Sequence, residues 1–212
     1  MATTLALLVT GAKTAANAQV DGAWSSTEWD AAMNRALEAL WVDALAINPT
    51  LRVSSTTLTV SATATPSASL PADFMGAVRV LKNAGTSNQQ EVFRSGTEPE
   101  GYDAISYRLE GSTFYVDPFE RSVGVYTLKY NPLPTALTGA VDLDAELSQH
   151  REYLQLHAAI QYMGANQESI TDLAPMFSIC KGRVETWAAR QRSSQPARIK
   201  DVRPRFTRLR WY

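Results

Sequence analysis

A helical pattern changes abruptly to a strand pattern at Asn48-Pro49, and this change constrains the fold more than any other feature of the sequence. Before it, apolar residues recur with a period of about 3.6 from Ser25 to Ile47, which predicts a helix. Ser25-Ser26-Thr27-Glu28 has the spacing of a capping box, so we expect the helix to begin there. Its predicted buried face consists of Trp29, Met33, Ala36, Leu37, Leu40, Trp41, Ala44 and Leu45.

The region from Thr50 to Ser69 has a different chemistry, because eleven of its twenty residues are Ser or Thr. Leu58 and Val60 alternate with polar neighbours, as is typical of a half-buried strand. Gly111-Ser112 predicts a tight turn between two later strands, and residues 118–121 predict a longer one. Further strands are predicted at residues 76–82, 90–94, 107–110, 113–117 and 123–130. Short strands with close turns favour an antiparallel sheet.

Two helices are predicted after this sheet, at about residues 144–164 and 171–192. Pro175 is tolerable in the first turn of the second helix, where amide donors lack intrahelical partners. The buried candidates of the first helix are Leu147, Tyr153, Leu154, Ile160 and Met163. Those of the second are Ile170, Leu173, Phe177, Cys180, Val184 and Trp187, in alternating steps of three and four.

The expected fold class is therefore α+β: a helical bundle formed by the N- and C-terminal helices, with an inserted antiparallel β module and an extended C-terminal arm. The expected divisions are N-terminal helices at 1–49, the β module at 50–134, C-terminal helices completing the bundle at 135–192, and a basic, aromatic arm at 193–212.

The N-terminus resembles a targeting signal only superficially. An apolar stretch precedes Ala16-Asn17-Ala18, but it has no basic segment before it, and Lys13 lies between it and the supposed cleavage point. A short helix with Leu5, Leu8 and Ala12 on one face is the expected structure. No run approaches the ~18 apolar residues of a membrane helix, so we expect no contact with a membrane.

The residues that usually carry chemistry do not form a catalytic pattern, and we expect no enzyme, metal or cofactor site. Gly11-Ala12-Lys13-Thr14 lacks the upstream glycine of a phosphate-binding loop. His150 and His157 would lie about 10 Å apart on one helix, too far to share a metal ion. Cys180 is the only cysteine, and a buried thiol on the apolar seam is expected to be inert. Capping and solvation explain carboxylate pairs such as Asp142 with Asp144.

The charge of the chain is distributed unevenly. From Arg190 to Tyr212 there are eight Lys and Arg against one acid, a net charge of +7, whereas the rest of the chain carries −8. A basic tail on an acidic body is usually an interaction arm. The candidate partner-binding residues are Arg198, Arg203, Arg205, Phe206, Arg208, Leu209, Arg210, Trp211 and Tyr212.

The residues of this arm are compatible with several interpretations. It can be a solvated tail, or it can be held by a partner that offsets an ordering cost of about 1 kcal/mol or more per residue. Nucleic acid would pair its phosphates with arginines and stack on Phe206, Trp211 and Tyr212. A protein surface would instead offer pockets for the aromatic and Arg side chains, and a neighbouring copy of this chain is a further candidate.

Three segments carry a resemblance to a known family. They are Leu70-Pro71-Ala72-Asp73-Phe74, the run YRLEGSTFYVDP from Tyr107 to Pro118, and the run from Tyr126 to Pro134. Together with the order of elements, they make most of the chain resemble the head-to-tail connector, or adaptor, proteins of tailed bacteriophages.

The resemblance implies a structural virion protein at the head-tail junction, assembled in the host cytoplasm. It implies a homo-oligomeric ring, commonly of twelve subunits, whose arms reach onto the portal protein and whose opposite face receives the tail or nozzle protein. Genomic DNA would pass through the central channel without sequence-specific binding. The alternative function is a single-strand nucleic-acid-binding module that uses the same basic, aromatic arm.

Overall fold

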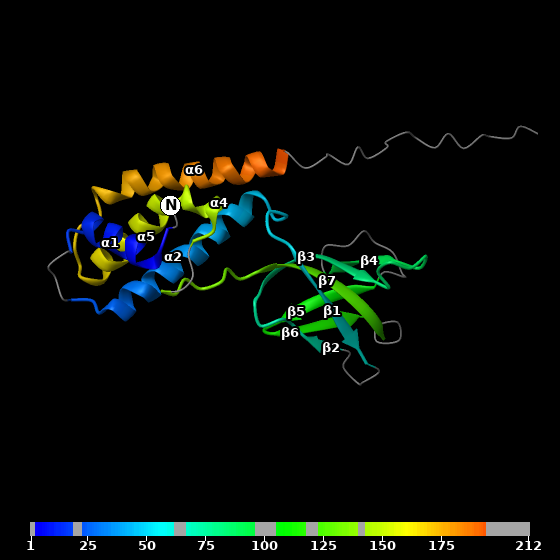
Figure 1. Cartoon of the computed structure of the whole chain (residues 1–212). Helices are drawn as coiled ribbons and strands as arrows, with labels where there is room; N and C mark the ends of the chain where they lie inside the picture. The colour runs from blue at the N-terminus through cyan, green and yellow to red at the C-terminus, as the bar shows by residue number, and fades with distance from the viewer. Residues whose placement is uncertain are drawn as a thin grey trace, which may run out of the picture.

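The computed structural model describes residues 3–18, 23–61, 67–95, 105–117, 123–139 and 143–193. The helices within these ranges are α1 (Leu5–Ala15), α2 (Ser26–Ile47), α4 (Ala145–Ser148), α5 (Arg151–Ala165) and α6 (Leu173–Ser193). The strands are β1 (Ser54–Val60), β2 (Ser67–Ser69), β3 (Phe74–Lys82), β4 (Gln90–Arg94), β5 (Ser106–Glu110), β6 (Thr113–Asp117) and β7 (Gly124–Pro132). Figure 1 shows the helices and the strands in two separate lobes, which we call the helical lobe and the sheet lobe.

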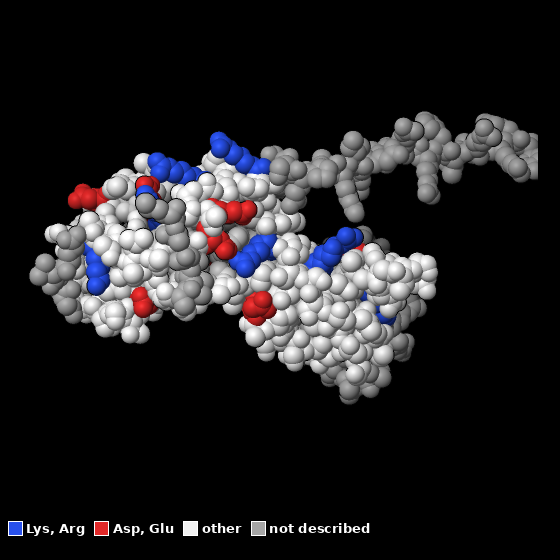
Figure 2. Space-filling model, viewed as in Figure 1, with Lys and Arg blue, Asp and Glu red and all other residues white. Residues whose placement is uncertain are grey.

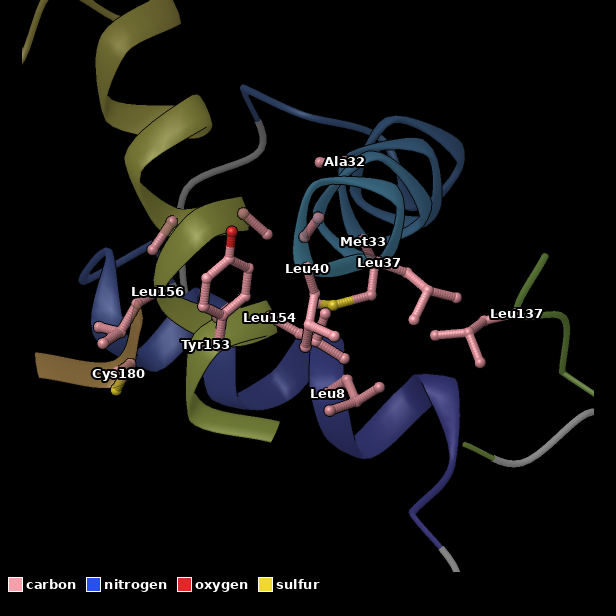
Figure 3. Close-up of a cluster of buried hydrophobic side chains, with 14 of the residues drawn as sticks. Leu8, Ala32, Met33, Leu37, Leu40, Leu137, Tyr153, Leu154, Leu156 and Cys180 are labelled. Carbon is pink, nitrogen blue, oxygen red and sulfur yellow. The ribbon is translucent and has the colours of Figure 1, made fainter. Parts of the chain in front are cut away.

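The helical lobe buries the apolar stripe that the sequence predicts on α2. This helix packs against α5 and α6, and α1 packs against α5 and also contacts α2. The capping box is present, because the side chain of Ser25 accepts from the amide of Glu28 and the carboxylate of Glu28 accepts from the amide of Ser25. In Figure 3, Leu8 of α1, Leu40 of α2 and Leu154 of α5 converge in this core.

An aromatic cluster closes the end of the helical lobe where α2 begins. Trp29 is fully buried, and its ring stacks on Tyr162 of α5 with 4.9 Å between centroids. Trp24 meets both rings edge-on, at 5.1 and 5.2 Å. The prediction that Trp29 and Trp41 lie on the buried face of this helix is confirmed by their burial.

The sheet lobe is one seven-stranded sheet with the order β1-β7-β3-β4-β5-β6-β2. Its two edge strands, β1 and β2, contact each other, so the sheet is nearly closed and resembles a barrel. Its interior is a separate apolar core that includes Leu58, Phe114, Tyr126 and Leu128. Burial in this core raises the pKa of Tyr126 to about 12.

The expected fold class was wrong. The chain does not form a helical bundle with a small inserted β module, because its sheet has seven strands, curls on itself and holds its own core. The sheet is also not purely antiparallel, since β4 and β5 pair in parallel. Periodicity predicts single strands, but it does not reveal that β1 and β2 come together and close the sheet. The expected arm lies almost entirely outside the described residues.

The predicted positions of individual elements agree with the structure more closely than the predicted fold class does. The tight turn is confirmed, because β5 and β6 are joined by Gly111-Ser112 and Gly111 has a φ of +58°, a conformation that glycine adopts without strain. The expected longer turn at residues 118–121 lies outside the described residues. The single helix expected at 144–164 is broken at Gln149 and His150 into α4 and α5.

Two connections join the lobes and are fixed to the helices by side-chain amides. At the end of α2, Asn48 donates from Nδ2 to the carbonyl of Ala188 in α6 at 3.3 Å, and its Oδ1 accepts from Thr50. On the return path, Asn34 of α2 accepts from the amide of Leu137 at 2.7 Å. The C-terminal half of α6 therefore lies beside the junction between the lobes.

Candidate interface

None of the nine predicted arm residues lies within the described part of the chain. The structure therefore brings none of them together. What it does establish is the position of the helix that precedes them. The last described element, α6, ends at Ser193, five residues after the carbonyl of Ala188 that contacts the lobe junction.

Ion pairs connect α6 to both neighbouring helices. Lys181 lies 2.8 Å from Asp43 of α2, and this contact raises the pKa of the lysine. Asp43 also accepts from the hydroxyl of Tyr153 in α5 at 2.7 Å, and burial together with this carboxylate raises the pKa of Tyr153. Arg183 lies 2.9 Å from Glu152 of α5. The base of the arm is thus anchored on two helices.

Figure 2 shows several basic side chains along α6, on the outer face of the helical lobe. Beside them the structure exposes apolar side chains that the sequence reasoning missed. Met176 and Ile179 are 54% and 60% exposed, and they line a groove of about 330 Å³ between α1, α5 and α6. Both lie outside the series of buried residues predicted on α6. Apolar residues outside that series were the sequence signal that could have indicated an exposed apolar surface.

The glycine-containing segment that resembles part of a phosphate-binding loop lies inside α1. Gly11 faces α5, and a Cβ at this position would collide with the side-chain amide of Gln155. Because the segment is helical, it does not form the loop that cradles a phosphate. The described part of the chain also contains no group of three or more His, Cys, Asp and Glu side chains that could hold a metal ion. Within the described ranges, no helix combines the length and apolar character needed to cross a bilayer.

The two histidines lie at the edge of the helical core. The ring of His150 packs against that of Trp187 at a tilt of 56°, with 5.0 Å between centroids, and His150 precedes α5 rather than lying inside the expected helix. His157 packs on Phe177, and Gln161 lies 2.8 Å from its Nδ1. His157 is therefore hydrogen-bonded, whereas Nε2 of His150 is buried without a partner among the described residues.

Burial lowers the pKa of both histidines. For His157, Arg35 lowers the pKa further and Asp43 opposes the shift.

The lowered pKa values predict that the stability of the protein depends on pH. As the pH falls through about 6.5, the histidines of the unfolded chain bind protons more readily than those of the folded chain. We therefore expect the free energy of unfolding to fall as the pH is lowered from about 7.5 to about 5.5. Each histidine contributes at most about 1.4 kcal/mol per pH unit. Urea unfolding across this range measures the slope, and the variant His150→Gln/His157→Gln is expected to flatten it. An unchanged slope in the variant would contradict the assignment.

Cys180 is buried on α6, as expected. Burial and the carboxylate of Glu152 raise the pKa of its thiol, so it is protonated at neutral pH. The described residues thus give no positive indication of nucleophilic chemistry at this position.

The three segments that carry the family resemblance meet in the sheet lobe. Asp73 accepts from the hydroxyl of Tyr130 at 3.0 Å, and its carbonyl accepts from the amide of Leu133. The amide of Leu70 donates to the carbonyl of Ser112 at 2.9 Å. These segments therefore form one connected part of the sheet lobe, near the point where the chain returns to the helices.

Comparison with models of known protein families identifies a family that matches this chain. A family model described as SU10 adaptor protein matches residues 3–201, which include both lobes and the start of the arm. No curated protein matches the chain.

Proposed function

Because the chain belongs to the SU10 adaptor protein family, we propose that it forms the ring that joins the portal to the tail in a tailed bacteriophage. The match over nearly the whole chain is the observation that carries this proposal. Family membership implies a structural component of the virion at the head-tail junction, in association with portal and tail proteins. It also implies a protein that is not an enzyme.

The proposed assembly is a ring of twelve copies around a channel for genomic DNA. In this proposal the nine arm residues, from Arg198 to Tyr212, bind the portal, and the opposite face of the ring receives the tail or nozzle protein. The packing of α6 against α2 and α5 supports a mechanical role for the base of the arm. Assembly would take place in the host cytoplasm.

Net charge supports passage of DNA without tight binding. Outside Arg190–Tyr212 the chain carries −8, and phosphate binding requires basic surface charge. The alternative function, single-strand nucleic-acid binding, is supported only by the sequence of the arm. It requires oligonucleotide affinity that falls steeply with salt and with loss of Arg210 or Trp211.

Native mass spectrometry of the purified chain, alone and mixed with portal, tests the proposed ring. One copy has a mass of 23.2 kDa, so a ring of twelve has a mass of about 280 kDa. We expect this ring to appear at least in the presence of the portal and to bind it as a unit. A chain that stays monomeric at micromolar concentration with portal present would contradict the proposal.

A further inference from the structure

The junction between the lobes contains two adjoining hollows, with volumes of about 150 and 410 Å³, that share part of their lining. We call them together the junction hollow. The residues of its lining that matter here are Trp41, Leu51, Arg52, Asp144, Glu146 and Leu147. Its walls are therefore partly apolar and aromatic, and two carboxylates stand at its rim.

These two carboxylates are not neutralised by the described part of the molecule. Asp144 and Glu146 are exposed, and neither carboxylate forms an ion pair or hydrogen bond with another described residue. Asp144 precedes α4 but makes no side-chain cap, so the capping explanation was wrong for it. The guanidinium of Arg52 lies over the ring of Trp41, at 5.5 Å from the centroid, rather than on either acid. Figure 2 shows acidic side chains gathered over α4.

The C-terminal half of α6 contacts residues of this junction. The ring of Trp187 contacts that of Trp41, with 6.5 Å between centroids, and Ala188 accepts the hydrogen bond from Asn48. Ser193 is six residues beyond Trp187, a rise of about 9 Å along a helix. A further five residues, to Arg198, span at most about 17 Å when extended. The first basic residues of the arm are thus within reach of the junction hollow of their own subunit.

The sequence after Ser193 has the complementary chemistry. Its 19 residues contain six Lys and Arg, a single acid and the aromatic residues Phe206, Trp211 and Tyr212. Arginine forms charge-assisted hydrogen bonds with carboxylates and stacks on aromatic rings, and both partners line the junction hollow. A tethered segment also has an effective concentration in the millimolar range, which favours its own subunit over another.

We propose that the junction hollow binds the C-terminal arm of the same subunit before assembly. Arginines of the arm pair with Asp144 and Glu146, and an aromatic side chain of the arm packs on the wall formed by Leu51 and Leu147. Exposed ion pairs are individually weak, so this docking is reversible. A partner with a larger complementary surface can therefore displace the arm from the junction hollow and bind it.

Limited trypsin cleavage of the full-length chain at submicromolar concentration tests this docking. Trypsin cuts after the Lys and Arg residues of the arm, and a docked arm is cut slowly. The variant Asp144→Asn/Glu146→Gln is expected to raise the initial cleavage rate about fivefold at low salt, the scale of two exposed ion pairs. The matched variant Glu38→Gln/Asp172→Asn removes the same charge from exposed acids outside the hollow and is expected to leave the rate unchanged.

High salt is expected to raise the wild-type cleavage rate to that of the Asp144→Asn/Glu146→Gln variant, because it screens exposed pairs. Equal cleavage rates in the wild type and this variant at low salt would overturn the proposal. Protection that grows with protein concentration would also overturn it, since the arm would then bind a second copy. The portal is absent from this experiment, so its failure leaves the proposed function standing.

Discussion

Deletion of residues 195–212 is expected to abolish binding to the portal while both lobes stay folded. The deleted segment contains all nine predicted contact residues, and Trp, Tyr and Arg are the side chains that most often dominate binding energy. Loss of two such contacts, each worth about 2 kcal/mol, already weakens binding by a factor of several hundred. Surface plasmon resonance on immobilised portal measures the loss, and circular dichroism shows whether the lobes are intact.

Single substitutions divide this effect among residues of the arm. Trp211→Ala and Arg210→Ala are each expected to weaken portal binding at least about tenfold. The matched control is Ser194→Ala, at the base of the arm, which is expected to have no effect. Portal affinity that survives the full deletion would remove the arm from the interface, although the family assignment would stand.

Replacement of Trp29 by alanine is expected to have the largest effect on stability. Its side chain is fully buried between Trp24 and Tyr162, so the truncation leaves a cavity that rigid helices cannot fill. Replacement of a buried Trp by Ala typically lowers the free energy of unfolding by about 3–5 kcal/mol. This loss is a large fraction of the free energy of unfolding of an ordinary domain, about 5–15 kcal/mol.

Urea unfolding followed by far-ultraviolet circular dichroism measures this loss. The control is Val42→Ala on the same helix, where the side chain is 54% exposed, and the expected change is within about 0.5 kcal/mol. A Trp29→Ala protein as stable as the control would show that the aromatic cluster does not support the helical lobe.

Helices and strands with a clear periodicity of apolar residues could be predicted from the sequence. The elements against which they pack or pair could not. The stripe from Trp29 to Ala44 predicts the buried face of α2, because a helix repeats every 3.6 residues whatever it packs against. Pairing in the sheet depends on contacts between distant segments, such as Ser54 with Tyr130 in β1 and β7. The parallel pair of β4 with β5 and the closure by β1 and β2 have no local signature.

The candidate interface could be described from the sequence only in part. The charge difference between body and tail predicts an interaction arm from composition alone, and the structure adds the position of α6, the helix before it. The two carboxylates of the junction hollow were missed because Asp144 was assigned to capping, which depends on side-chain geometry. Met176 and Ile179 were missed because the series of buried candidates that includes Cys180 was sufficient to predict α6 without them.

The most direct test of the proposed role is imaging of the purified chain assembled with portal particles by electron cryomicroscopy. The account predicts a ring of this chain on one end of the portal, with density for residues 195–212 lying on portal subunits. A ring that contacts the portal only through its lobes, with no arm density on portal subunits, would contradict it.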